Sequence, residues 1–227
     1  MPRKRKQPTT WYGKTWRFIW YDDSLLSWIV NIVLAFLVIK FIVYPVLGAV
    51  LGTSLPVVAV VSESMDHDYT RDACSETYKL CGDLSSMRKH ADFKEYWRQC
   101  GGWYEDRGIT AQAFRDYPLS NGFSKGDIII LTGADPAGIR RGDVIVFQSR
   151  KPYPIIHRVI DKELTADGYL FATKGDHNAL QITTAFDPLL DEAGVSEDAV
   201  MGVARFRVPW LGWVKVGLVE LLQGNNC

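Results

Sequence analysis

Three short segments of this 227-residue sequence carry side chains that could perform covalent catalysis. The first is the run SESM at 62–65, which follows the apolar stretch 57–61. A serine hydroxyl such as that of Ser64 is a weak nucleophile unless a neighbouring base removes its proton. Taken alone, Ser64 is also consistent with a turn or helix-cap residue. A catalytic interpretation therefore depends on whether the chain supplies a base.

A histidine and an aspartate are the candidate companions of this serine. His157 interrupts the apolar run PIIHRVI at 154–160, and an imidazole that titrates near neutral pH is suited to act as a base. Asp176 lies in TKGDHN at 173–178, and a buried aspartate can fix the tautomer of a catalytic histidine. The structural alternatives are a hydrogen-bonded core histidine and an Asx-turn aspartate.

The element that precedes these segments is a long apolar stretch at 25–51, whose only formal charge is Lys40. About 20 apolar residues suffice to cross a bilayer as a helix, so the stretch predicts a transmembrane anchor. It is longer than the apolar core of a signal peptide and lacks a convincing A-x-A cleavage site after it. Basic residues are concentrated before it, which places the N-terminus in the cytoplasm by the positive-inside rule.

The remainder predicts a mainly β domain that positions the candidate residues. Short β-branched runs bounded by Gly, Pro and Asp indicate strands at 56–61, 127–131, 143–148, 155–160, 169–173 and 200–208. The polar, aromatic stretch 66–123 is more typical of short helices and forms an insertion. The expected organisation is a cytoplasmic basic N-terminus (1–24), a transmembrane anchor (25–51) and an extracytoplasmic catalytic β domain (52–227).

Charge and cysteine content exclude several classes of function. The 26 basic and 26 acidic side chains cancel, so a nucleic-acid partner is not expected. Cys74 and Cys81 could form a disulfide in an oxidising compartment, but four cysteines leave the connectivity open. Their spacing does not indicate a zinc site, even with His90 nearby. No motif calls for a metal, nucleotide or prosthetic group, so no cofactor is expected.

The catalytic segments together resemble the signal peptidase I family, in its archaeal and endoplasmic-reticulum branch. The resemblance rests on SESM, RGDVIVF, IIHRVI, TKGDHN and the closing VARFRVPWLGW, in the same order as in the family. It covers 25–65 and roughly 123–213. The bacterial branch carries lysine at the base position, whereas this chain has His157, and Lys151 and Lys162 lie too far along the chain to replace it.

The resemblance implies a role for each matching residue. Ser64 would be the nucleophile and His157 the general base and then general acid. The Ser64 backbone N–H and the Ser62 hydroxyl would form the oxyanion hole. Asp176 matches the first acidic position of the family, but its second acidic position holds Ile182 here. The third member of the triad is therefore left open between Asp176 and Asp187.

The function implied is that of a membrane-bound serine endopeptidase that removes signal peptides from exported precursor proteins at the outer membrane face. Its expected partners are those precursors, the lipid bilayer and the protein translocation machinery. A non-catalytic single-span subunit, whose β domain binds or assembles with other proteins, is the alternative. A sortase-like transpeptidase would need a cysteine nucleophile in a strand, and no cysteine of this chain lies in an expected strand.

Overall fold

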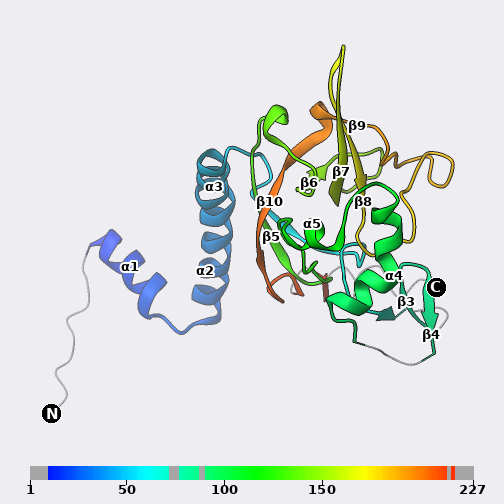
Figure 1. Cartoon of the computed structure of the whole chain (residues 1–227). Coiled ribbons are helices and arrows are strands. Elements are labelled where there is room, and N and C mark those ends of the chain that lie inside the picture. The colour runs from blue at the N-terminus through cyan, green and yellow to red at the C-terminus, as the bar shows by residue number, and fades with distance from the viewer. Residues whose placement is uncertain (1–9, 72–76, 87–89, 214–215, 218–227) are drawn as a thin grey trace. The chain divides into compact units, whose positions relative to one another are not determined.

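A computed structural model describes residues 10–71, 77–86, 90–213 and 216–217, and the chain divides into two compact units, Met1–Val50 and Leu51–Cys227 (Figure 1). The N-terminal unit is helical. Its helices are α1 (Trp11–Tyr21), α2 (Leu25–Val38), a π-helical turn (Ile39–Val43) and α3 (Tyr44–Leu51).

The helical stretch Leu25–Leu51 is 27 residues long, has a mean hydropathy of 2.5, and is the one candidate membrane span in the described part of the chain. Two polar side chains in α2 are explained by its contact with α1. The Ser27 hydroxyl donates to the carbonyl of Phe18, and the Asn31 amide donates to that of Ile19. Both bonds occupy carbonyls of the last turn of α1, which have no partner within that helix.

The second unit is built on a seven-stranded antiparallel sheet with the strand order β1-β5-β10-β6-β7-β8-β9 (Figure 1). Its strands are β1 (Val57–Ala59), β5 (Ile128–Thr132), β6 (Val144–Phe147), β7 (Ile155–Thr165), β8 (Gly168–Lys174), β9 (Val195–Ser196) and β10 (Val200–Val208). Short 3₁₀ turns lie at Pro136–Gly138 and Glu197–Ala199. The prediction of a mainly β fold with one N-terminal apolar helix is confirmed.

The stretch between β1 and β5 forms its own small structure. It holds the expected short helices, α4 (Phe93–Glu105) and α5 (Ala111–Arg115), with Asp92 and Thr110 as their N-caps. It also contains a three-stranded sheet of very short strands that the sequence did not predict: β2 (Thr70–Arg71), β3 (Tyr78–Leu80) and β4 (Asp83–Ser85). Strands of two or three residues are too short to show a period-2 pattern.

One disulfide connects these two parts of the insertion. It joins Cys81, between β3 and β4, to Cys100 in α4. The structure thus pairs Cys81 with Cys100 rather than with Cys74, because the folding of the insertion brings α4 next to the β3–β4 turn. Cys74 and Cys227 lie outside the described residues.

Three groups of buried apolar side chains form the core of the second unit. Two lie on the sheet, and the third belongs to the insertion. This third group gathers around the aromatic rings of Tyr96, Tyr104 and Phe114 and includes Ile160 from β7. The insertion is therefore packed directly on the strand that carries His157, and α4 and α5 lie next to β7 and β8 in Figure 1.

Candidate active site

Ser64 lies in a tight turn that directly follows β1. The turn is closed by a hydrogen bond from the Asp66 N–H to the Glu63 carbonyl. Its next residue, Met65, is buried in the main apolar core, which fixes the turn to the body of the sheet. The Ser64 carbonyl accepts a hydrogen bond of 2.9 Å from the His177 backbone N–H. These contacts hold the backbone of Ser64, whose side chain is half-buried.

His157 faces this serine from the middle of the sheet. It lies in β7 opposite Ile145 of β6 and is 3% exposed. Its Nε2 atom lies 3.0 Å from the Ser64 Oγ atom, which is hydrogen-bonding distance. The two residues are 93 positions apart in the sequence. The fold thus brings together the two groups that the sequence analysis selected as nucleophile and base.

The other ring nitrogen of His157 contacts a carboxylate that the sequence analysis did not select. His157 Nδ1 forms a close ion-pair contact with Oε1 of Glu192, which is completely buried. Both atoms are buried, and neither has a hydrogen-bonding partner among the described residues, so what joins them is the close approach of the ring nitrogen to the carboxylate. Ser64, His157 and Glu192 therefore form a continuous hydroxyl–imidazole–carboxylate row.

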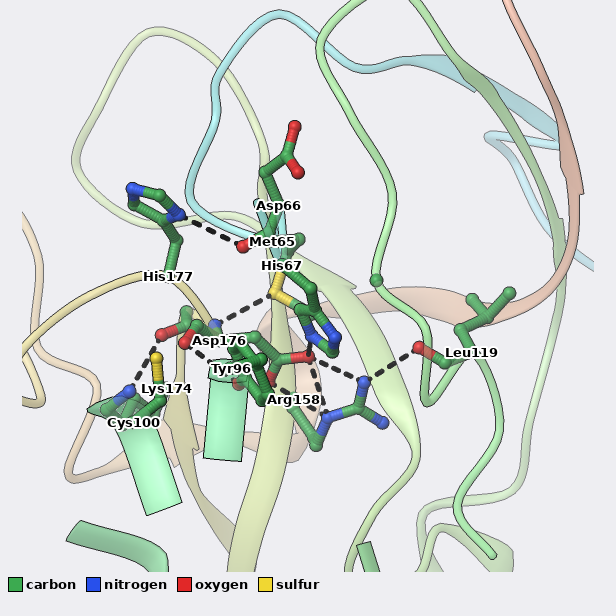
Figure 2. A network of polar contacts seen from close by, with 12 residues as sticks. Met65, Asp66, His67, Tyr96, Cys100, Leu119, Arg158, Lys174, Asp176 and His177 are labelled. Atoms are coloured by element: carbon green, nitrogen blue, oxygen red, sulfur yellow. Dashed lines mark hydrogen bonds and ion pairs between the residues drawn. The ribbon is translucent and has the colours of Figure 1, made fainter. Parts of the chain in front are cut away.

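Asp176 lies in a separate network, in which His157 takes no part (Figure 2). The Arg158 guanidinium donates to both of its carboxylate oxygens, at 2.7 to 3.1 Å. Tyr104 and His67 contact the same carboxylate at 3.0 and 2.9 Å. Burial alone would raise the pKa of Asp176, but the Arg158 charge and the His67 hydrogen bond hold it well below its ordinary value. This aspartate is an ionised counter-ion in the interior.

Asp187, the other aspartate put forward, lies at the surface of the loop after β8. Its carboxylate pairs with the Lys151 ammonium at 2.6 Å, and both side chains are partly exposed. The hydrogen bond from Lys151 lowers the pKa of Asp187. The second lysine considered in the sequence, Lys162, donates to the carbonyls of three residues of the 136–139 turn. Both lysines are thus engaged away from Ser64.

Ser62, the side chain expected in the oxyanion hole, lies beside Ser64. Its Oγ atom lies 3.2 Å from the Ser64 Oγ atom, and the residue is exposed. Gly175 also packs closely against the serine–histidine pair. A Cβ atom added to it would lie 2.8 Å from both His157 Nε2 and the Ser64 carbonyl oxygen. A larger residue at 175 would therefore press on the serine–histidine pair.

This chain is similar to known proteins over part of its length. No family model matches it. The signal peptidase complex catalytic subunit SEC11 of Clavispora lusitaniae is 32% identical over 99 residues, which make up 43% of this chain and 58% of the relative. The SEC11 proteins of Penicillium rubens and Candida albicans are 32% and 29% identical over 99 residues, covering 55% and 58% of those relatives.

These relatives are named as catalytic subunits of signal peptidase complexes. They confirm the resemblance to the endoplasmic-reticulum branch of signal peptidases. The chain spans less than two thirds of the length of the SEC11 proteins it matches. The activity, substrates and partners of SEC11 are therefore matters for proposal in this chain.

Three buried charged residues in and around the candidate site were missed by the sequence analysis. Arg158 follows His157 directly, and its position beside a polar histidine in an apolar run was the available signal that it is buried with a partner. Lys174, also completely buried, packs its ammonium against the rings of Trp103 and Tyr104, and burial lowers its pKa to about 8. Glu192 belongs to none of the sequence boxes, so nothing in the sequence pointed to it.

Proposed function

We propose that this chain is a membrane-anchored serine endopeptidase that removes signal peptides from exported precursor proteins. The observation that supports the proposal best is the 3.0 Å separation between Ser64 Oγ and His157 Nε2. A hydroxyl and a buried imidazole at this distance form the nucleophile–base pair that acyl transfer requires. The names of the relatives supply the substrate class, since a signal peptidase acts on signal peptides.

In the proposed reaction, Ser64 Oγ attacks the carbonyl carbon of the scissile peptide bond while His157 Nε2 takes its proton. The C–N bond then breaks, and the imidazolium returns the proton to the departing amine. A water molecule, deprotonated by the same nitrogen, hydrolyses the resulting acyl-enzyme and frees Ser64. The imidazolium returns this second proton to Ser64 Oγ as the acyl–oxygen bond breaks, so Nε2 of His157 carries the proton in both halves of the reaction.

The negative charge that develops on the carbonyl oxygen needs donors in fixed positions. We assign this role to the Ser64 backbone N–H and the Ser62 hydroxyl, whose oxygen lies 3.2 Å from Ser64 Oγ. Removing one such donor typically lowers kcat about 100- to 1,000-fold. The tight turn at 63–66 contains Ser64, and Ser62 lies directly before this turn.

The position of the site in the chain supports action at a membrane surface. Ser64 follows the candidate span Leu25–Leu51 after only a short connection and β1. Lys14 and Arg17 precede the span, so the positive-inside rule places the N-terminus in the cytoplasm and the β domain outside. We propose that the substrate is presented by the bilayer and that the chain associates with the translocation machinery. The SEC11 relatives are named as subunits of a complex, and we propose that this chain also works with other subunits.

The proposal is tested by cleavage of a signal-peptide-bearing precursor by the full-length protein in detergent micelles. Ser64→Ala and His157→Ala should each lower the cleavage rate at least about 1,000-fold, because each removes a member of the pair that activates the nucleophile. His90→Ala is the matched control, since this exposed histidine pairs with Asp68 at the surface. Thermal unfolding shows whether each variant is folded.

Two outcomes would contradict the proposal. Cleavage that survives both alanine substitutions would remove Ser64 and His157 from the mechanism. A folded wild-type protein that binds the precursor but does not cleave it, alone or with its associated subunits, would favour the non-catalytic binding or assembly subunit instead.

A further inference from the structure

The acidic position that the signal peptidase resemblance assigns to residue 182 is occupied by an isoleucine, yet a carboxylate lies beside it. The backbone N–H of Ile182 donates to Oε2 of Glu192 at 2.5 Å, and the Glu192 N–H donates back to the Ile182 carbonyl at 2.8 Å. Glu192 is thus paired with position 182 through the backbone as well as through its side chain. The carboxylate comes from a later part of the chain but reaches the neighbourhood where the family places its second aspartate.

From this arrangement we infer that Glu192, rather than Asp176 or Asp187, is the acidic positioning residue of the active site. The inference rests on the proposed endopeptidase function and adds its third member. Oε1 of Glu192 meets Nδ1 of His157, while Oε2 is held by the Ile182 N–H. Each carboxylate oxygen therefore has its own contact: Oε1 with the base, and Oε2 with the backbone of the loop that carries Glu192.

A carboxylate beside Nδ1 favours one tautomer of the base. A carboxylate accepts hydrogen bonds, so the proton of a neutral His157 ring belongs on Nδ1. The lone pair of Nε2 then points at the Ser64 hydroxyl, which is the form that can remove its proton. When His157 becomes an imidazolium during the reaction, the buried charge of Glu192 stabilises it.

The loop holds Glu192 rigidly in this position. The Gln181 amide donates to the carbonyls of Thr173 and Glu192, both at 2.9 Å. The Thr173 N–H also donates to the Glu192 carbonyl, at 2.7 Å. The end of β8 and the segment carrying Glu192 are therefore tied together at the Glu192 backbone carbonyl. A positioning residue requires such support, because its effect depends on a fixed orientation.

The two aspartates are engaged elsewhere. Both Asp176 oxygens are occupied by Arg158, with Tyr104 and His67 adding further bonds, and Asp187 pairs with Lys151 at the surface. Neither of these networks includes His157. The carboxylate of Glu192 is the one that lies against the base in the described part of the chain.

Kinetics of precursor cleavage by the full-length protein in micelles test the inference with four variants. Glu192→Gln keeps the shape but removes the charge and should lower kcat between about 100- and 10,000-fold, with KM within about threefold. Glu192→Asp restores a carboxylate and should recover at least about tenfold over the glutamine variant. Asp191→Asn is the matched control, because the exposed side chain of this neighbour accepts a hydrogen bond from the Ala193 N–H in the loop. This variant should retain wild-type kinetics. Asp187→Asn tests the rival aspartate and should also retain them.

A second measurement does not depend on activity. The chain has four histidines, so a ¹⁵N-histidine-labelled wild-type sample gives a simple spectrum of ring N–H groups. The inference predicts a strongly deshielded ring N–H resonance that disappears in His157→Ala, moves upfield in Glu192→Gln and stays in place in Asp187→Asn. This signal reports the contact even if a variant at 192 is too unstable for kinetics.

The possible failures can be told apart. If the wild type cleaves the precursor and Glu192→Gln retains more than half of its kcat, the inference is wrong while the proposed function stands. Loss of activity and of the deshielded signal in Asp187→Asn would assign the role to Asp187. If the wild type shows the signal but cleaves no precursor, the proposed function fails and the contact is structural.

Discussion

Arg158 shows how a single step along a strand separates two charge networks. Successive residues of a β-strand point to opposite faces of the sheet. His157 therefore reaches Ser64 and Glu192, while Arg158 points to the other face and meets Asp176. The buried Arg158–Asp176 pair takes no part in proton transfer to the nucleophile. Its place is between β7 and the aromatic rings of the insertion.

This pair predicts a large effect on stability from Asp176→Asn. The substitution leaves the completely buried Arg158 guanidinium without its counter-ion, which typically costs about 3 to 5 kcal/mol. Urea unfolding of the full-length protein at pH 7 measures the loss. Asp161→Asn is the control, because its surface pair with Arg141 should contribute less than about 1 kcal/mol. Equal, small losses in both variants would contradict the prediction.

Asp176 also makes the stability of the wild-type protein depend on pH. The pKa of Asp176 is lower in the folded protein than the ordinary value of 3.8, so below that value the unfolded chain binds more protons than the folded one. The stabilisation by Asp176 is fully present above about pH 5 and is lost as the pH falls through 3.8 toward the folded pKa. The stability difference between wild type and Asp176→Asn should therefore shrink on going from pH 5 to pH 2.5.

At the scale of elements, the insertion acts as a cover for the loop that follows β8. Tyr96 of α4 donates to the Asp176 carbonyl at 3.0 Å, and the Cys81 N–H donates to the His177 carbonyl at 3.1 Å. The His177 N–H in turn holds the Ser64 carbonyl. The insertion is thus connected to the nucleophile turn through one shared loop, and the Cys81–Cys100 disulfide keeps the two contacting parts together.

Removing the disulfide should loosen this connection. Closing a loop of this size by a disulfide typically contributes about 3 kcal/mol. In a Cys74→Ser/Cys227→Ser background, reductant should lower the urea midpoint and the precursor cleavage rate together. The same background with Cys81→Ala and Cys100→Ala added should show both losses without reductant and no response to it. A cleavage rate indifferent to reductant would show that the insertion does not support the site.

For the whole molecule, the arrangement that matters is a candidate membrane span followed closely by the nucleophile. Topology can be tested through the β7–β8 hairpin, whose tip carries the exposed Leu164. Leu164→Asn together with Ala166→Thr creates a glycosylation acceptor there, and the proposed orientation predicts its modification in microsomes. The single substitution Leu164→Asn lacks the acceptor motif and is the control. An unmodified acceptor in a folded protein would place the β domain on the cytoplasmic side.

The sequence by itself determined those features that local patterns encode. The length of the apolar stretch predicted the N-terminal helix, and β-branched runs predicted six strands of the seven-stranded sheet. The largest difference in bounds is at β7, which runs five residues past its predicted end, to Thr165. The boxes around Ser64 and His157 selected two residues that the fold places 3.0 Å apart. Each of these features has a periodicity, a length or a motif that can be read within a few neighbouring residues.

Only the tertiary structure decided which carboxylate meets His157 and which cysteine meets Cys81. The contact with Glu192 arises because the loop after β8 folds back on Thr173, and the disulfide arises because α4 packs beside the β3–β4 turn. Such contacts join residues far apart in the chain, and neither partner carries a local signal of the other. A carboxylate acts on a base through its position in space, so the same charge can come from a different part of the chain without leaving a motif behind.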